Sequence, residues 1–279
     1  MKKSKKIRVL IKKNITFLLC FSISLSLSNI MIAHASEKSI NPSSVYKNLL
    51  SEPERNVYNQ VYSALIGHDE SLFAMIDPLS EKELEDTMNA IFNDHPEIFW
   101  ANTSYKYAVD SKGIVHKIKL SYGINSSDLA IAKSNFDRII SNLVAGANQY
   151  TNDLDKERYI FDAICSMNTY NVSNALNQSA YSALATGSSV CAGYARAFQL
   201  VCLQAGIPCY YVTGTSKGEN HAWNIVQING AYYNVDLTWD DCITEATGYS
   251  SYHYFNKNDL EFSFDHSRSP LSSQLMSCI

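Results

Sequence analysis

A cysteine, a histidine and an aspartate stand in distinctive local sequences in the second half of the chain. Cys191 lies in the segment GSSVCAGYA, His221 in ENHAWN and Asp236 in YYNVDLTW. A thiol nucleophile, an imidazole base and a carboxylate that orients the base are the groups of a cysteine acyl-transfer triad. Each residue alone has ordinary structural uses, in a core or at a turn. Their combination is what predicts a catalytic site.

The nucleophile is expected at the start of a helix. Residues 190–205 are apolar or small, and Gly206 followed by Pro208 is a typical helix stop. The unpaired N–H groups and the positive end of the dipole at a helix N-terminus stabilise a thiolate and can bind an oxyanion. Ala192 and Gly193 keep the surroundings small, which leaves room for a substrate.

The base and the carboxylate are expected to meet on a β-hairpin. An Asn-Gly pair at 229–230 separates two strand-like segments, 221–228 and 231–238, and is the strongest short hairpin signal available. A two-residue turn makes His221 and Asp236 diagonal neighbours on one face, about 7–8 Å apart at the backbone. A three-residue loop would place them on opposite faces. We therefore expect Asp236 to orient His221, and a helix packed against that face to supply the nucleophile.

Residues 36–150 are expected to form a mainly helical N-terminal region with a short hairpin. Apolar residues recur at helical spacing from 54 to 76, and Ser80 with Glu83 forms a capping box for a second helix. The other elements expected here are a loose polar lead-in at 36–52, strands at 105–109 and 115–122, and a helix at 127–150.

Several weaker candidates accompany the three residues. Tyr181 could donate its hydroxyl to an oxyanion or simply pack, and Trp223 could line the cleft or fill the core. Asp240 and Asp241 are expected in a solvated turn, because no ring of acidic ligands at regular spacing indicates a cation site. Other histidines lack comparable settings and are expected to be surface or core groups: His68, His95, His116, His253 and His266.

The first 35 residues indicate a secretory signal peptide. Residues 1–14 contain seven Lys and Arg and no acidic residue. The apolar stretch that follows ends in the Ala-x-Ala pattern at 33–35. The alternative is an uncleaved membrane anchor; no later segment is long and apolar enough to span a membrane. We expect a secreted or surface-associated protein with no stable membrane insertion after signal removal.

The net charge of the chain limits which kinds of partner it is expected to bind. Seven of the 23 Lys and Arg but none of the 27 Asp and Glu lie in the first 35 residues, so the remaining chain has a net charge of about −11. Nucleic acids and anionic membranes reward positive charge, so neither is an expected partner.

The cysteines give no sign of a metal site. Six follow residue 35, and none forms the close pairs typical of zinc ligands. Buried free thiols are the simplest expectation for Cys165, Cys202 and Cys209; one disulfide is the alternative, which an oxidising compartment permits.

The three segments together resemble the transglutaminase-like superfamily, most of all its secreted bacterial branch. The similarity extends over roughly residues 150–240. It implies an α+β fold with a papain-like core, in which the helix bearing the nucleophile packs on an antiparallel sheet. In that core Cys191 would be the nucleophile, His221 the general base and Asp236 the orienting carboxylate. The expected organisation is a signal peptide at 1–35, the N-terminal region at 36–150, the catalytic core at 151–260 and a C-terminal tail at 261–279.

The resemblance also implies a reaction class. The enzyme would form a thioester with an amide substrate and pass the acyl group to an amine, which crosslinks proteins, or to water. The alternatives are a cysteine peptidase or amidase of the same fold, and a non-catalytic surface or cell-wall binding protein. The expected partner is a protein or peptide, with cell-wall peptide as one option. No cofactor or metal is expected, since nothing resembles the calcium architecture of animal relatives.

Overall fold

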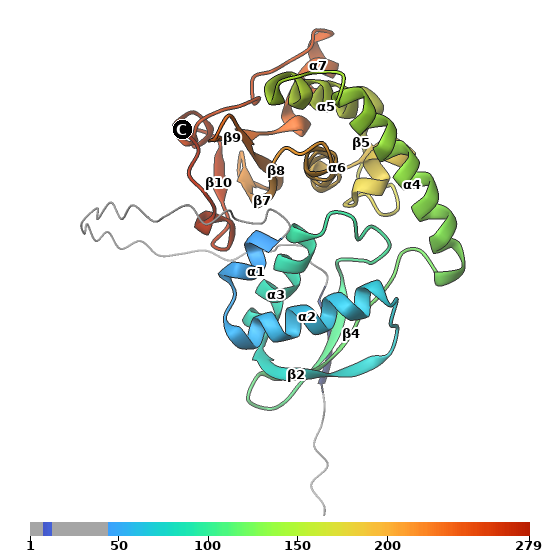
Figure 1. The fold of residues 1–279 in the computed structure, drawn as a ribbon. Helices are drawn as coiled ribbons and strands as arrows, with labels where there is room; N and C mark the ends of the chain where they lie inside the picture. The colour runs from blue at the N-terminus through green and yellow to red at the C-terminus, as the bar shows by residue number, and fades with distance from the viewer. Residues whose placement is uncertain (1–7, 13–43) are drawn as a thin grey trace, which may run out of the picture.

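The computed structural model describes residues 8–12 and 44–279, and of the side chains only those from 44 onward. An N-terminal mixed region lies against the core that carries the candidate site (Figure 1). Among the described residues, no helix combines the length and the apolar character needed to cross a membrane.

The N-terminal region holds a four-stranded antiparallel sheet in the order β1-β3-β4-β2, with three helices. Helices still predominate over residues 36–150, as expected, because α4 (Ser126–Ala147) also lies there, but the expected short hairpin belongs to this larger sheet. The elements of the N-terminal region are β1 (Arg8–Lys12), α1 (Val45–Leu49), α2 (Glu52–Ile66), β2 (Leu72–Ser80), α3 (Glu81–Asp94), β3 (Tyr105–Val109) and β4 (Ile114–Lys119).

Two local predictions here had different outcomes. The capping box was confirmed: Ser80 is the N-cap of α3, and Glu83 bonds back to its backbone. The helix expected at 54–76 was too long, because α2 ends at Ile66 and the next residues turn through His68 at a φ of 55°. Residues 72–76 are instead the first part of strand β2, and over so short a stretch their apolar side chains also fit helical spacing.

The described part of the lead-in, from residue 44, is not loose. Residues 45–49 form α1, and Tyr46 is completely buried. Its hydroxyl donates to the backbone carbonyl of Tyr211 at 2.6 Å and lies 2.8 Å from the hydroxyl of Ser272, so it ties this segment to the core.

Strand β1 falls within the predicted signal peptide. Its backbone pairs with β3 from Arg8 opposite Val109 to Lys12 opposite Tyr105. This differs from the expectation that none of the first 35 residues belongs to the fold. The rest of the predicted signal peptide lies outside the described residues.

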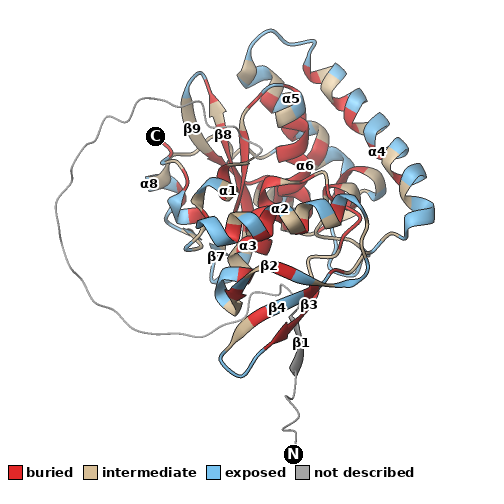
Figure 2. Cartoon of the chain, turned by 60° about the horizontal axis from the view of Figure 1, so that its bottom comes forward, coloured by how far each residue is buried: buried red, intermediate tan, exposed pale blue. Residues whose placement is uncertain are grey.

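The core is a second antiparallel sheet, in the order β10-β7-β8-β9, packed against α6. Helix α6 is almost entirely buried (Figure 2), as its apolar sequence requires. This arrangement confirms the α+β fold with a cysteine-bearing helix on an antiparallel sheet. Its elements are α4 (Ser126–Ala147), α5 (Asp153–Met167), β5 (Thr169–Tyr170), β6 (Ser188–Ser189), α6 (Cys191–Gln204), β7 (Cys209–Ser216), β8 (Glu219–Ile228), β9 (Ala231–Val235), α7 (Leu237–Thr247), α8 (Asp259–Phe262) and β10 (His266–Arg268).

The C-terminal segment is part of this sheet and not a separate tail. Strand β10 pairs with β7, with His266 opposite Ser216 and Arg268 opposite Gly214. Three residues are too few to show a strand period in the sequence. This pairing nevertheless brings residue 266 to the centre of the candidate site.

Candidate active site

Cys191 is the first residue of α6, as predicted. The N-cap position is Val190, whose side chain has no acceptor for the N–H groups of the first turn. The Gly193 N–H donates to the Val190 carbonyl at 2.8 Å, so the N–H groups of Cys191 and Ala192 and the positive end of the helix dipole remain available at the thiol. The arrangement suits both a thiolate and a developing oxyanion.

A glycine allows the loop before α6 to approach the helix closely. A Cβ at Gly193 would lie 2.5 Å from the Cβ of Ser189 and 2.8 Å from the carbonyl oxygen of Asn177. No larger residue fits without moving this loop. The same loop is held from the other side by Asn168, whose amide donates to the Ser189 hydroxyl at 2.7 Å. The segment that carries the thiol is thus fixed in place.

The hairpin has the predicted register. Ile228 pairs with Ala231 across the two-residue turn, and the pairing continues to Asn224 opposite Val235. The second strand is shorter than expected, because it ends at Val235 and Asp236 becomes the N-cap of α7.

Asp236 holds both α7 and the imidazole. Its Oδ1 accepts from the backbone N–H groups of Thr238 at 2.9 Å and Trp239 at 3.2 Å. Its Oδ2 lies 2.6 Å from Nε2 of His221. The backbone bonds prevent the carboxylate from rotating, so the cap also fixes the direction of the bond to His221.

The helix that carries the thiol does not pack on the face of β8 that was predicted. Ala222 clusters with Ala192 and Ala195 of α6, and the amide of Asn224 donates to the Ala195 carbonyl at 2.9 Å. These residues alternate with His221 along β8, so the body of α6 covers the opposite face of the strand. Only the first residue of the helix, Cys191, reaches the His221 ring, and it raises the pKa of that ring.

The electrostatics favour a protonated His221 ring. Burial lowers the pKa of His221, but the charge and hydrogen bond of Asp236, together with Cys191, raise it to about 10. Burial likewise raises the pKa of Asp236, and the two histidines that contact it hold that pKa well below its usual range. Because Nε2 of His221 is committed to Asp236, Nδ1 is the nitrogen that faces the thiol.

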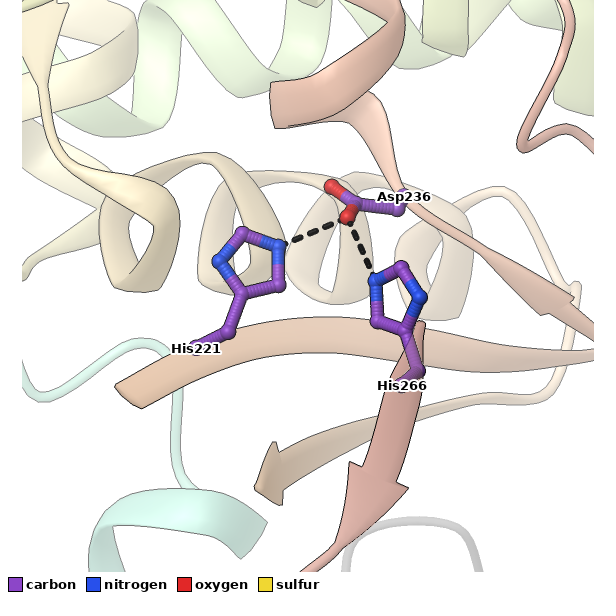
Figure 3. A group of neighbouring side chains, drawn as sticks. All are labelled: His221, Asp236 and His266. Atoms are coloured by element: carbon purple, nitrogen blue, oxygen red, sulfur yellow. Dashed lines mark hydrogen bonds and ion pairs between the residues drawn. The ribbon is translucent and has the colours of Figure 1, made fainter. Parts of the chain in front are cut away.

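A third titratable ring, which the sequence did not single out, completes the cluster. Nε2 of His266 lies 3.1 Å from the same Oδ2 of Asp236 that His221 contacts (Figure 3). Nδ1 of His266 lies 2.6 Å from the carboxylate of Asp265. The side chain of His266 is 1% exposed. The only available signal was the acidic neighbour at 265, which is common in loops.

A cleft of about 660 Å³ opens at Cys191 and His221. One wall belongs to the core and includes Tyr211, Gly214 and Ser267. The opposite wall is a stripe of α3 at helical spacing: Lys82, Glu85, Asp86, Asn89, Phe92 and Asn93. The N-terminal region therefore forms one wall of the cleft.

The two accessory candidates serve packing. Tyr181 stacks on Phe99 at 4.6 Å and 12°, and it is not among the described residues that line the cleft. Trp223 is 1% exposed and its indole donates to Asn234, so it supports His221 from the core and does not form a cleft wall. Neither side chain is placed to bind an oxyanion.

Asp240 and Asp241 are buried in α7, not in a solvated turn. One carboxylate oxygen of Asp240 accepts from the Ser251 hydroxyl at 2.6 Å and the His253 N–H at 2.7 Å, and the other accepts from the Tyr254 N–H at 3.0 Å. Asp241 accepts from the Tyr194 hydroxyl at 2.5 Å. These carboxylates organise the loop after α7 and the packing of α7 on α6.

Three ligand-type atoms converge in the cluster, on His221, Asp236 and His266, within 4.8 Å of one another. Zinc lies about 2.0–2.2 Å from nitrogen and oxygen ligands, which keeps tetrahedral ligand atoms more than about 3 Å apart. The 2.6 Å between His221 and Asp236 is shorter than that and is a hydrogen-bond distance. The geometry is therefore that of a hydrogen-bonded cluster. All six cysteines from Cys165 onward are free thiols.

Comparison with known proteins supports the fold of this core. Residues 141–237 match the model of the transglutaminase-like superfamily. The human kyphoscoliosis peptidase is 31% identical over 132 residues, which cover 41% of this chain and 20% of that protein; the mouse protein is 30% identical over 139 residues, covering 44% and 21%. The chain thus matches about a fifth of the length of these curated relatives.

Solved structures give more distant matches. A crystal structure described as a TGase is 13% identical, with a TM-score of 0.36, over 52% of this chain and 47% of that one. The periplasmic domain of TgpA from Pseudomonas aeruginosa is 16% identical, with a TM-score of 0.33, over 47% and 55%. The match to the superfamily model includes Cys191, His221 and Asp236. The part of the chain that carries the candidate site is thus similar to the transglutaminase-like superfamily.

Proposed function

We propose that this protein is a cysteine acyltransferase that forms a thioester with an amide substrate. The observation that carries the proposal is the 2.6 Å contact between His221 and Asp236, together with the Cys191 thiol at the start of α6, which raises the pKa of the same ring. These groups open onto a cleft large enough for a peptide segment.

In the proposed reaction, the Cys191 thiolate attacks the amide carbonyl carbon. The negative charge that develops on the carbonyl oxygen is stabilised by N–H groups of the first turn of α6. Nδ1 of His221 then gives its proton to the departing nitrogen as the C–N bond breaks. This leaves a thioester on Cys191 and a neutral imidazole. A primary amine gives up a proton to His221 and attacks the thioester, which releases the thiolate and forms a new amide.

Water as the acceptor gives the second candidate, a cysteine peptidase or amidase with the same site. The name of the human relative, a peptidase, favours this outcome. The two candidates share every step up to the thioester, so only the acceptor separates them. A third candidate, from a different class, is a surface or cell-wall binding protein in which the site no longer reacts. The intact hydrogen-bonded cluster counts against it.

We further propose that the enzyme acts outside the cell, on a protein or on cell-wall peptide. The basic, apolar and Ala-x-Ala segments of residues 1–35 support export. The strongly negative chain that remains disfavours nucleic acid as a partner.

The test is mass spectrometry of a glutamine-rich protein incubated with the enzyme and a tagged primary amine. Cys191→Ala is the inactive variant, and Cys242→Ala is the matched control, because that thiol is also partly buried but lies on α7. An amine adduct on glutamine that requires Cys191 but not Cys242 would establish the transferase. Chain cleavage or deamidation without adduct would leave the hydrolase.

The binding candidate makes a separate prediction. It requires no covalent change in the substrate, and retention of substrate by both the parent protein and Cys191→Ala. Trapping a thioester on Cys191 by rapid acid quench would exclude it.

A further inference from the structure

A continuous path of hydrogen bonds extends behind the proposed triad. It begins at His221, crosses Asp236 and reaches His266 (Figure 3). It continues from His266 to Asp265 at 2.6 Å, and from the other carboxylate oxygen of Asp265 to the Tyr254 hydroxyl at 2.6 Å. The path thus alternates between rings and carboxylates.

The hydrogen positions on His266 follow from its partners. Both ring nitrogens lie within hydrogen-bond distance of a carboxylate oxygen, and ionised carboxylates only accept. A neutral imidazole would direct a lone pair at one of them. Both nitrogens must therefore donate, so the ring is an imidazolium as long as Asp236 and Asp265 are ionised.

The ring is held rigidly by aromatic side chains. Phe262 lies 3.9 Å from its centroid, with Trp223 at 5.1 Å and Tyr254 at 5.5 Å. Its backbone is fixed by the pairing of β10 with β7. A ring in this position can neither leave Asp236 nor rotate to exchange partners.

We propose that His266 is a positioning residue, which acts as a buried cation between Asp265 and Asp236 and holds the Asp236 carboxylate in place under His221. This proposal rests on the proposed function only for the role of His221. The positive ring of His266 lies 5.6 Å from that of His221, on the far side of the shared carboxylate. It therefore reduces the excess negative charge at Asp236 and makes the His221 proton easier to give to a leaving group.

The other charged and titratable groups around these rings come from several elements. They are Cys191 of α6, Lys217 of the turn after β7, Asp236 and Asp240 at the start of α7, Tyr254 of the following loop and Asp265 before β10. The experiment below changes His266 and Asp265 separately, so these other contributions stay constant.

The test measures alkylation of Cys191 by iodoacetamide as a function of pH, followed on the Cys191 peptide by mass spectrometry. Iodoacetamide replaces the substrate, so the result does not depend on whether the enzyme transfers acyl groups. The alkaline inflection of the rate reports loss of the His221 proton. His266→Gln keeps a donor toward Asp236 but removes the charge, and Asp265→Asn removes the partner that holds the second proton. His116→Gln is the control, because it alters an exposed His–Asp pair on the distant β4.

His266→Gln should move the alkaline inflection up by about one pH unit, since a positive charge near His221 is lost. Asp265→Asn should move it up by less, since the negative charge of Asp265 is lost together with the second proton of His266. His116→Gln should leave it unchanged. In the parent protein, nitrogen-15 NMR should show both ring nitrogens of His266 protonated at pH 7. An inflection in His266→Gln equal to that of the parent would overturn the proposal. A neutral His266 ring in the parent protein would overturn it even if His266→Gln fails to fold.

Discussion

Replacing Glu157 with glutamine should change how the stability of this protein depends on pH. Glu157 lies on α5 and is completely buried. One carboxylate oxygen accepts from the amide of Asn256 at 2.8 Å, while the other oxygen and the Asn256 carbonyl oxygen have no partner. Burial raises the pKa of Glu157 from 4.5 to about 8, although the bond from Asn256 lowers it. In the neutral acid the second oxygen becomes a donor and can satisfy the Asn256 carbonyl.

The direction in which stability changes with pH follows from the number of protons bound in the folded and unfolded states. Between pH 4.5 and pH 8 the folded protein keeps the Glu157 proton and the unfolded chain has lost it. Stability contributed by this proton is therefore present below pH 4.5 and is lost as the pH rises through 8. The slope is about 1.4 kcal/mol per pH unit, or roughly 3 kcal/mol between pH 5 and pH 7.5.

Urea unfolding of the parent and Glu157→Gln at half-unit steps from pH 5 to pH 8 measures this slope. Glutamine can make both bonds to Asn256 without a proton, so the variant should lack the Glu157 contribution. The difference in unfolding free energy between the two proteins should then increase with pH in favour of the variant. Other titrating groups occur in both proteins and cancel. A difference that stays constant across this range would refute the reasoning, because Glu157 would then be ionised in the fold.

Three further outcomes are expected. Asp236→Asn should reduce turnover about 10³–10⁴-fold, measured as amine incorporation, because an amide cannot stabilise a charged His221 ring; a loss below tenfold would argue against the assigned role. Gly193→Ala should cost about 1–3 kcal/mol in urea unfolding, since its Cβ would overlap Ser189, and a neutral result would mean that the loop moves freely. Tyr46→Phe should cost about 1–2 kcal/mol by the same assay, because the Tyr211 carbonyl and the Ser272 hydroxyl lose their buried hydrogen-bond partner. Unchanged stability would show that this contact contributes nothing to the joining of the two regions.

The parts of the site that the sequence predicted correctly are those governed by local rules. The Asn-Gly turn determines the register that brings His221 near Asp236, and the small residues after Cys191 permit the helix start. The capping box at Ser80 is equally local.

The parts that were missed depend on contacts between distant segments. His266 reaches Asp236 only because three residues of β10 pair with β7. The burial of Asp240 depends on the loop at 251–254, whose N–H groups and hydroxyl surround its carboxylate. Neither contact leaves a periodic pattern in the sequence, so the residues look like ordinary loop residues.

The two walls of the cleft have separate origins in the chain. The thiol and imidazole lie within residues 141–237, which match the superfamily, whereas the opposing stripe of α3 lies far outside that range. Under the proposed function, substitutions along residues 82–93 would change which peptides are accepted and leave the reacting atoms undisturbed. A chimera that exchanges only the α3 face would then be the most direct way to evolve a new specificity on an unchanged site.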